Sequence, residues 1–218
     1  MPFPPTDERP HPPGAGAWWQ ETWVFDLWTP DGLGAFTWLT LVPNQRRAWY
    51  WAVLVRPGEP VLYLADLDVP LPRSGLEVRS EGLWASHECE VAYEQWTVAN
   101  EAYAVVLDHP DDALGRAHGQ PAPVAFDIEW YAEAAPEPLE GTTGYHQAGT
   151  VNALVELQRE RLEVEGPASR SHWWGVPPAG GEVGGLEVAL RLGDDPNGAV
   201  VVRALTSDGW QEWRRPAP

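Results

Sequence analysis

Residues 19–28, WQETWVFDLW, decide the fold class, because their side chains alternate between two faces with the period of two that a β-strand requires. The segment Thr29-Pro30-Asp31-Gly32 has the composition of a turn, and residues 33–42, LGAFTWLTLV, form a second run of the same kind. Two such runs joined by a tight turn predict an antiparallel hairpin. The first strand of this hairpin is expected to place four side chains on one face: Glu21, Trp23, Phe25 and Leu27.

Similar runs follow along the rest of the chain, separated by turn residues. We expect strands at residues 46–56, 61–67, 76–79, 83–93, 96–107, 124–131, 145–157, 161–165, 185–192 and 199–205. Residues 96–107 are rich in Ala and Glu, so a short helix is an alternative there, and residues 109–114 resemble a helix onset. A tight hairpin is expected at residues 193–198, GDDPNG. Many short strands with frequent turns predict an all-β fold, either an antiparallel barrel or two packed β-domains.

Composition along the chain suggests how the strands are divided. Residues 1–16 are Pro-rich, polar and aperiodic, so they are expected to form a disordered arm. The stretch EAAPEPLEGTTG, residues 133–144, is typical of a linker. We therefore expect an N-terminal β-domain at 17–135 and a smaller C-terminal β-domain at 142–216 that packs against it.

The overall composition excludes several classes of function. The chain has 218 residues and a formal net charge of −18, which disfavours nucleic acid and anionic membrane surfaces as partners. All 14 basic residues are Arg, so a lysine Schiff base cannot form, and Cys89 is the only cysteine. No apolar run is long enough to span a membrane, and the N-terminus does not resemble a signal peptide. We expect a cytoplasmic protein, and its oligomeric state stays open.

The 14 tryptophans need a structural explanation. Bulky aromatic rings with a polar N–H suit the wall of a mostly apolar ligand cavity, such as the interior of a barrel. The alternative is that they simply pack between two sheets. Trp51, on a strand with Trp49, is a candidate for such a cavity wall.

Carboxylates on strand faces are candidates for acid–base chemistry. Glu21 shares a face with Trp23 and Phe25, and an acid among aromatic rings is suited to donate a proton. Its alternative role is to pair with an arginine at the rim. Asp127 and Glu129 are two residues apart on one face, where they are ligand-binding candidates if that face is interior and a solvated edge if it is exterior.

Metal and cofactor motifs are weak in this sequence. His87 and Cys89 have a spacing that could supply two zinc ligands, but no third ligand lies nearby in the sequence, so a buried histidine and a buried cysteine are favoured. The sequence contains no HExxH, no GxSxG and no complete GxGxxG motif. We expect neither a metal nor a cofactor, and we retain His87 as a ligand-binding candidate.

Residues 166–176, GPASRSHWWGV, carry the most chemical information, because Arg170, His172 and Trp174 fall on one side and Gly175 closes the segment as a turn. With QETWVFDLW, LWASHECE and AFDIEWYA, this segment resembles the lipocalin-like family of carotenoid 1,2-hydratases (hydroxyneurosporene synthases). Wider relatives of that family include AttH-like proteins, tocopherol cyclases and pericyclases. The resemblance implies calycin-like β-domains around an apolar pocket for an isoprenoid, polyene or polyketide chain, without a metal or redox cofactor.

The resemblance also implies roles for individual residues. Glu21 and Trp23 match its first motif, and His172, Trp174 and Gly175 match its later one. Hydratase members resemble Asp-His-x-Trp-Gly at the later motif, whereas this chain has Ser171 in place of the aspartate, so the acid that would protonate an alkene is absent there.

Three functions remain open at this point: a cofactor-independent cyclase or isomerase (or a hydratase-like lyase), a carrier of a hydrophobic small molecule, and an interaction protein with a filled core. The catalytic candidates are Glu21, His172 and Arg170. The ligand-binding candidates are Trp23, Phe25, Trp51, His87, Asp127, Glu129, Gln147 and Trp174.

Overall fold

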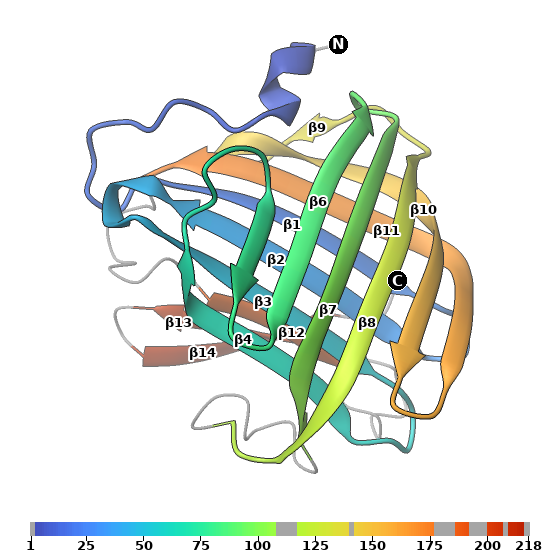
Figure 1. Cartoon of the computed structure of the whole chain (residues 1–218). Coiled ribbons are helices and arrows are strands. Elements are labelled where there is room, and N and C mark those ends of the chain that lie inside the picture. The colour runs from blue at the N-terminus through green and yellow to red at the C-terminus, as the bar shows by residue number, and fades with distance from the viewer. Residues whose placement is uncertain are drawn as a thin grey trace.

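The chain folds as an all-β, lipocalin-like antiparallel barrel, which confirms the predicted fold class (Figure 1). The computed structural model describes residues 3–107, 117–139 and 142–176, together with the backbone of three strands at 186–191, 200–206 and 209–215. The large sheet contains β1 (Gln20–Trp28), β2 (Gly34–Val42), β3 (Arg47–Val55), β4 (Val61–Pro70), β5 (Glu77–Ser80), β6 (Leu83–Val91), β7 (Gln95–Leu107), β8 (Gln120–Ala132), β9 (Glu137–Pro138), β10 (Thr143–Leu157) and β11 (Arg161–Gly175).

Eight of these strands close on themselves. Each strand pairs with its neighbour in the order β4-β3-β2-β1-β11-β10-β8-β7, and β7 pairs back to β4 through Val105–Leu107 and Val61–Tyr63. Strands β6 and β5 extend the sheet beyond β7, and the short β9 pairs with β10. An eight-stranded barrel has an interior that side chains can fill or that can hold one small ligand.

The inner faces of the strands follow the period-two pattern of the sequence. Along β1 the buried positions include Glu21, Trp23, Phe25 and Leu27, the four side chains expected on one face. These inward residues, except Glu21, belong to one apolar cluster with inward residues of the other barrel strands, among them Tyr50, Trp96 and Trp130. The barrel interior is therefore the main hydrophobic core.

The outer faces of β2 and β3 are buried as well. Trp51 lies there in a second cluster with Trp38 and Trp49, on the opposite face of the sheet from Tyr50. This placement separates Trp51 from the interior side chains.

The N-terminal arm differs from the predicted disordered segment. Residues 3–16 are placed against one end of the barrel and include the 3-10 turn η1 (Pro5–Glu8), as Figure 1 shows. The Tyr93 hydroxyl donates a hydrogen bond to the carbonyl of Pro4, and the Asn44 amide, in the 3-10 turn η2 (Pro43–Gln45), donates to the carbonyls of Gly14 and Gly16. These hydrogen bonds, together with the buried ion pair between Glu8 and Arg170, hold the arm against the barrel end.

The expected linker and boundary also differ from the structure. Strands β10 and β11 lie after the linker, yet they pair with β8 and β1. The segment expected to turn at residues 166–176 continues β11 as far as Gly175, because both of its edges are paired. Residues 96–107 are a strand and not a helix.

The end of the chain adds a separate sheet. Strands β12 (Leu186–Arg191), β13 (Val200–Thr206) and β14 (Gly209–Arg215) form a three-stranded antiparallel sheet. The predicted packing of this region against residues 17–135 stays a prediction, and the expected features at 109–114 and 193–198 lie outside the described residues. In the described part of the chain, no helix has the length and apolar character needed to cross a membrane.

Two glycines beside the barrel end give a test of the β10–β11 pairing. Gly144 has φ of +156°, and a Cβ there would lie 2.3 Å from the His172 carbonyl oxygen, whereas Gly175 has φ of +133° with open space around it. Alanine is strained at both positions, but only Gly144→Ala also collides with backbone, so it is expected to destabilise the protein by about 1–3 kcal/mol more than Gly175→Ala. Urea unfolding of both variants measures this difference. Equal losses would contradict the close approach of the two strands.

Candidate functional site

A buried arginine organises the arm-covered end of the barrel. Arg170 lies on the inner face of β11 with 1% of its side chain exposed, and its guanidinium donates to both carboxylate oxygens of Glu8 at 3.0 and 2.6 Å. Its remaining donors reach the Gln147 side-chain oxygen at 3.0 and 2.6 Å. Gln147 in turn donates to the carbonyls of Tyr93 and Ala134. The arginine is therefore satisfied by polar partners on both sides.

Aromatic rings surround the same guanidinium. Its central carbon lies 5.0–5.9 Å from the centroids of four rings: Tyr93, Trp96, Trp130 and Tyr145. A cation held over ring faces in a water-poor environment gains electrostatic stabilisation from each of them. Two of these residues also donate to Glu8, the Trp96 indole N–H at 2.7 Å and the Tyr145 hydroxyl at 2.7 Å. The Glu8 carboxylate thus accepts hydrogen bonds from Arg170, Trp96 and Tyr145, and from the Cys89 thiol at 3.6 Å.

Tyr145 connects this ion pair to a second buried acid. The Tyr145 oxygen lies 3.0 Å from Nδ1 of His172, and Nε2 of His172 lies 2.8 Å from a carboxylate oxygen of Glu21. Strand pairing explains this proximity, because β11 is hydrogen-bonded to β10 on one edge and to β1 on the other. The Trp23 ring stacks on His172 with centroids 4.5 Å apart.

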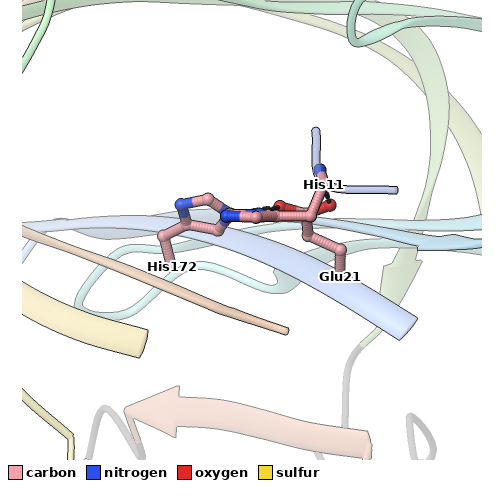
Figure 2. A group of neighbouring side chains, drawn as sticks. All are labelled: His11, Glu21 and His172. Atoms are coloured by element: carbon pink, nitrogen blue, oxygen red, sulfur yellow. Dashed lines mark hydrogen bonds and ion pairs between the residues drawn. The ribbon is translucent and has the colours of Figure 1, made fainter. Parts of the chain in front are cut away.

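The arm contributes a second histidine to Glu21. Nδ1 of His11 lies 2.7 Å from the same carboxylate oxygen that His172 contacts, and the His11 backbone N–H donates to the other oxygen at 2.8 Å. Figure 2 shows both imidazole rings close to the Glu21 carboxylate. Trp174 stacks on His11 at 3.9 Å and covers the group.

Burial shifts the pKa values of the groups in this network. Desolvation lowers the pKa of His172 from its usual value, although its hydrogen bond to Glu21 opposes the shift. Burial likewise raises the pKa of the Tyr145 hydroxyl, so the phenol keeps its proton. Burial, with the nearby Glu8 carboxylate, raises the pKa of the Cys89 thiol to about 12. A thiol in that state is a poor nucleophile.

A different environment lies deeper in the barrel, around Phe25. His87 is buried on the inner face of β6, its ring meets Phe25 edge-on at 5.5 Å, and burial lowers its pKa to about 3. Within the described residues, neither nitrogen of His87 has a hydrogen-bond partner, nor do the indole nitrogens of Trp23 and Trp130. Trp130 also lies against Phe25, at 6.4 Å. Four buried nitrogens of the interior therefore lack partners, and three of them belong to rings that contact Phe25.

The structure brings most of the predicted site residues to this end of the barrel, though not all of them. Glu21, Trp23, Gln147, Arg170, His172 and Trp174 lie in the polar network or against it, and Phe25 and His87 lie in the interior below it. Asp127 and Glu129 are exposed on the outside of β8, where they border a hollow of about 280 Å³ that is lined by further acidic side chains. They correspond to the solvated-edge alternative. Trp51 lies in the outer cluster.

Sequence reasoning missed the residues that the arm supplies, Glu8 and His11, as well as Trp96 and Tyr145. No local spacing marks Glu8 or His11, since the arm has the composition of a disordered segment. A signal was present elsewhere: Glu21 shares a strand face with Trp23 and Phe25, and Arg170 shares a side with Trp174. A charge buried among such rings needs an oppositely charged or hydrogen-bonding partner.

The comparison with known protein families includes the arm in the same domain as the barrel. The sequence model of a family described as "Domain of unknown function (DUF7064)" matches residues 4–200, which include the arm and the whole barrel. The chain belongs to this family. No curated protein and no solved structure gives a significant match to the chain. The resemblance to carotenoid hydratases therefore stays a prediction.

Removing the ion pair between Glu8 of the arm and Arg170 of the barrel tests the position of the arm. Glu8→Gln leaves the Arg170 charge buried without its counter-charge, so it is expected to destabilise the protein by about 3–5 kcal/mol. The matched control is Glu77→Gln, which breaks an exposed pair with Arg79 and is expected to cost under about 1 kcal/mol. Urea unfolding measures both. A small, equal effect of the two changes would mean that the arm does not occupy this position.

His87 makes stability depend on pH. Between its folded pKa of about 3 and the usual value of 6.5, the unfolded chain binds a proton at His87 that the folded protein does not. Stability is therefore lost as the pH falls through this window, by at most about 1.4 kcal/mol per pH unit for this group. Unfolding free energies at pH 7, 5.5 and 4.5 should fall more steeply for the wild type than for His87→Leu. Parallel pH profiles would show that His87 is solvated.

Proposed function

We propose that the protein is a lipocalin-like carrier that holds one small apolar molecule, an isoprenoid, polyene or polyketide with a hydrogen-bonding group, inside the barrel. The observation that carries the proposal is the set of unpartnered buried nitrogens on His87, Trp23 and Trp130, of which His87 and Trp130 contact the Phe25 ring. Buried polar atoms nearly always have partners, so each unpaired one needs an explanation. The carbonyl or hydroxyl of a ligand would supply the missing partner.

The character of the interior supports an apolar ligand. The unpartnered nitrogens belong to or adjoin the apolar cluster of the barrel interior, although Arg170 lies over the Trp130 ring and His172 stacks on Trp23. Most small-molecule sites are likewise mainly apolar, with a few polar groups that fix the orientation of the ligand. His87 is neutral at neutral pH, because burial lowers its pKa to about 3, so it can donate through one nitrogen and accept through the other. It therefore suits a hydroxyl or a carbonyl better than a carboxylate.

The arm would close the barrel over such a ligand. Glu8 fills the space beside Arg170 and binds donors of four barrel side chains, so the charged end of the barrel is already satisfied without a ligand. This leaves the uncharged interior as the place for binding. A carrier needs no further chemistry, and the absence of an aspartate at Ser171 agrees with that role.

The test is a titration of intrinsic tryptophan fluorescence with a panel of polyenes, isoprenoids and fatty alcohols. Saturable quenching at micromolar ligand is expected, with one ligand class preferred. Trp130→Phe removes one inward N–H and is expected to weaken binding roughly fivefold, which corresponds to one hydrogen bond of about 1 kcal/mol. Trp51→Phe makes the same chemical change in the outer cluster and should leave the affinity unchanged.

Two outcomes would overturn the carrier role. Absence of quenching by every ligand would favour an interaction protein with a filled core. If the bound ligand were recovered chemically changed after long incubation, the protein would be a cofactor-independent cyclase or isomerase. Ligand recovered intact supports the carrier. Mass spectrometry of the extracted ligand separates these last two results.

A further inference from the structure

Three side chains from distant parts of the chain point their ligand-type atoms at one spot. His11 comes from the arm, Glu21 from β1 and His172 from β11, and one atom of each lies within 4.8 Å of the other two (Figure 2). We infer that His11, Glu21 and His172 form a binding site for a divalent transition-metal ion such as Zn²⁺ or Fe²⁺. This inference does not depend on the proposed ligand of the barrel interior.

The spacing of the three atoms suits a metal of this size. The nitrogens of His11 and His172 lie 2.7 and 2.8 Å from the same oxygen of Glu21. Around a tetrahedral zinc ion with bonds of about 2.0–2.1 Å, neighbouring ligand atoms lie about 3.3 Å apart. The Glu21 oxygen must therefore move back by about 0.5 Å from each nitrogen for an ion to fit among the three atoms.

The surroundings of the ligands resemble the outer shell of a metal site. Metal-binding histidines usually engage their other ring nitrogen with an oxygen, which fixes the orientation of the ring. Here Nδ1 of His172 lies 3.0 Å from the Tyr145 oxygen, and Nε2 of His11 lies 3.6 Å from a carboxylate oxygen of Asp7. Trp23 and Trp174 stack on the two rings and limit their rotation.

The hydrogen-bond partners of His172 are compatible with a ligand role. Its Nδ1 lies 3.0 Å from the Tyr145 oxygen, and its Nε2 lies 2.8 Å from the Glu21 carboxylate. When the proton of a neutral His172 is on Nδ1, facing Tyr145, Nε2 presents a lone pair toward Glu21. This is the tautomer in which Nε2 can bind a metal ion while the other nitrogen is fixed by an oxygen.

The donor set selects the class of metal. Two imidazoles and one carboxylate occur in zinc sites that keep an open position and in non-haem iron sites, whereas Ca²⁺ and Mg²⁺ prefer oxygen ligands alone. Among the described residues, His11, Glu21 and His172 are the group with this arrangement. Three protein ligands leave a coordination position for water.

The experiment measures metal binding directly. The full-length protein, stripped with a chelator, is titrated with Zn²⁺ by calorimetry at pH 7.5, and a Co²⁺ titration gives an absorption spectrum that reports the coordination. One ion per chain with micromolar or tighter affinity is expected. His11→Ala should weaken binding at least tenfold. The control, His118→Ala, changes an exposed histidine outside the group and should bind as the wild type does.

Folding of each variant is checked by near-ultraviolet circular dichroism, which reports the packed tryptophans. His11 is the ligand of choice for the test because its side chain is 21% exposed and its loss leaves the barrel core intact. If the stripped wild type binds neither ion, or if a folded His11→Ala variant binds as tightly as the wild type, the inference is wrong. A thermal stability gain with Zn²⁺ that His11→Ala lacks would support it.

Discussion

The charge of Arg170 determines how the arm-covered end of the barrel is built. A guanidinium cannot lose its proton, and it lies on an inner strand face where water does not reach it. Removing this charge from water would cost too much free energy without a partner of opposite charge. Glu8 supplies that charge with two-point geometry, and aromatic rings surround the pair. The position of the arm follows from this single requirement, since Glu8 cannot reach the arginine unless residues 3–16 cover the barrel end.

Two buried histidines show how the interior divides into a polar end and an apolar centre. Both His172 and His87 lie on inner faces, and burial lowers the pKa of each. The ring nitrogens of His172 face Tyr145 and Glu21, whereas those of His87 have no partner in the described part of the chain. The first histidine belongs to a polar network in which both of its ring nitrogens have partners. The second lies where a neutral polar group of a ligand would be accepted.

The sequence predicts local features well and long-range ones poorly. Period two is a local property of a strand, so the sequence groups Glu21 with Trp23 on one strand face and Arg170 with His172 on one side of residues 166–176, and the structure has the same groupings. The pairing that brings Trp23 opposite His172 joins segments about 150 residues apart, and no local pattern encodes it. The arm was expected to be disordered for the same reason: its sequence is Pro-rich, polar and aperiodic, and the charge that orders it lies in β11.

Because the arm carries both Glu8 and His11, its closure and the inferred metal site are linked. Glu8 fixes the arm through an ion pair with β11, and this places His11 against Glu21 at 2.7 Å. His11 reaches a metal ion only when the arm is closed, so an ion bound to the closed form would have one more ligand. The ion would therefore stabilise the closed arm by the same free energy by which the closed arm strengthens metal binding. Entry of a ligand past the arm would break the contact of His11. A bound metal would therefore slow exchange of the barrel ligand, while the interior nitrogens would determine which ligand is held.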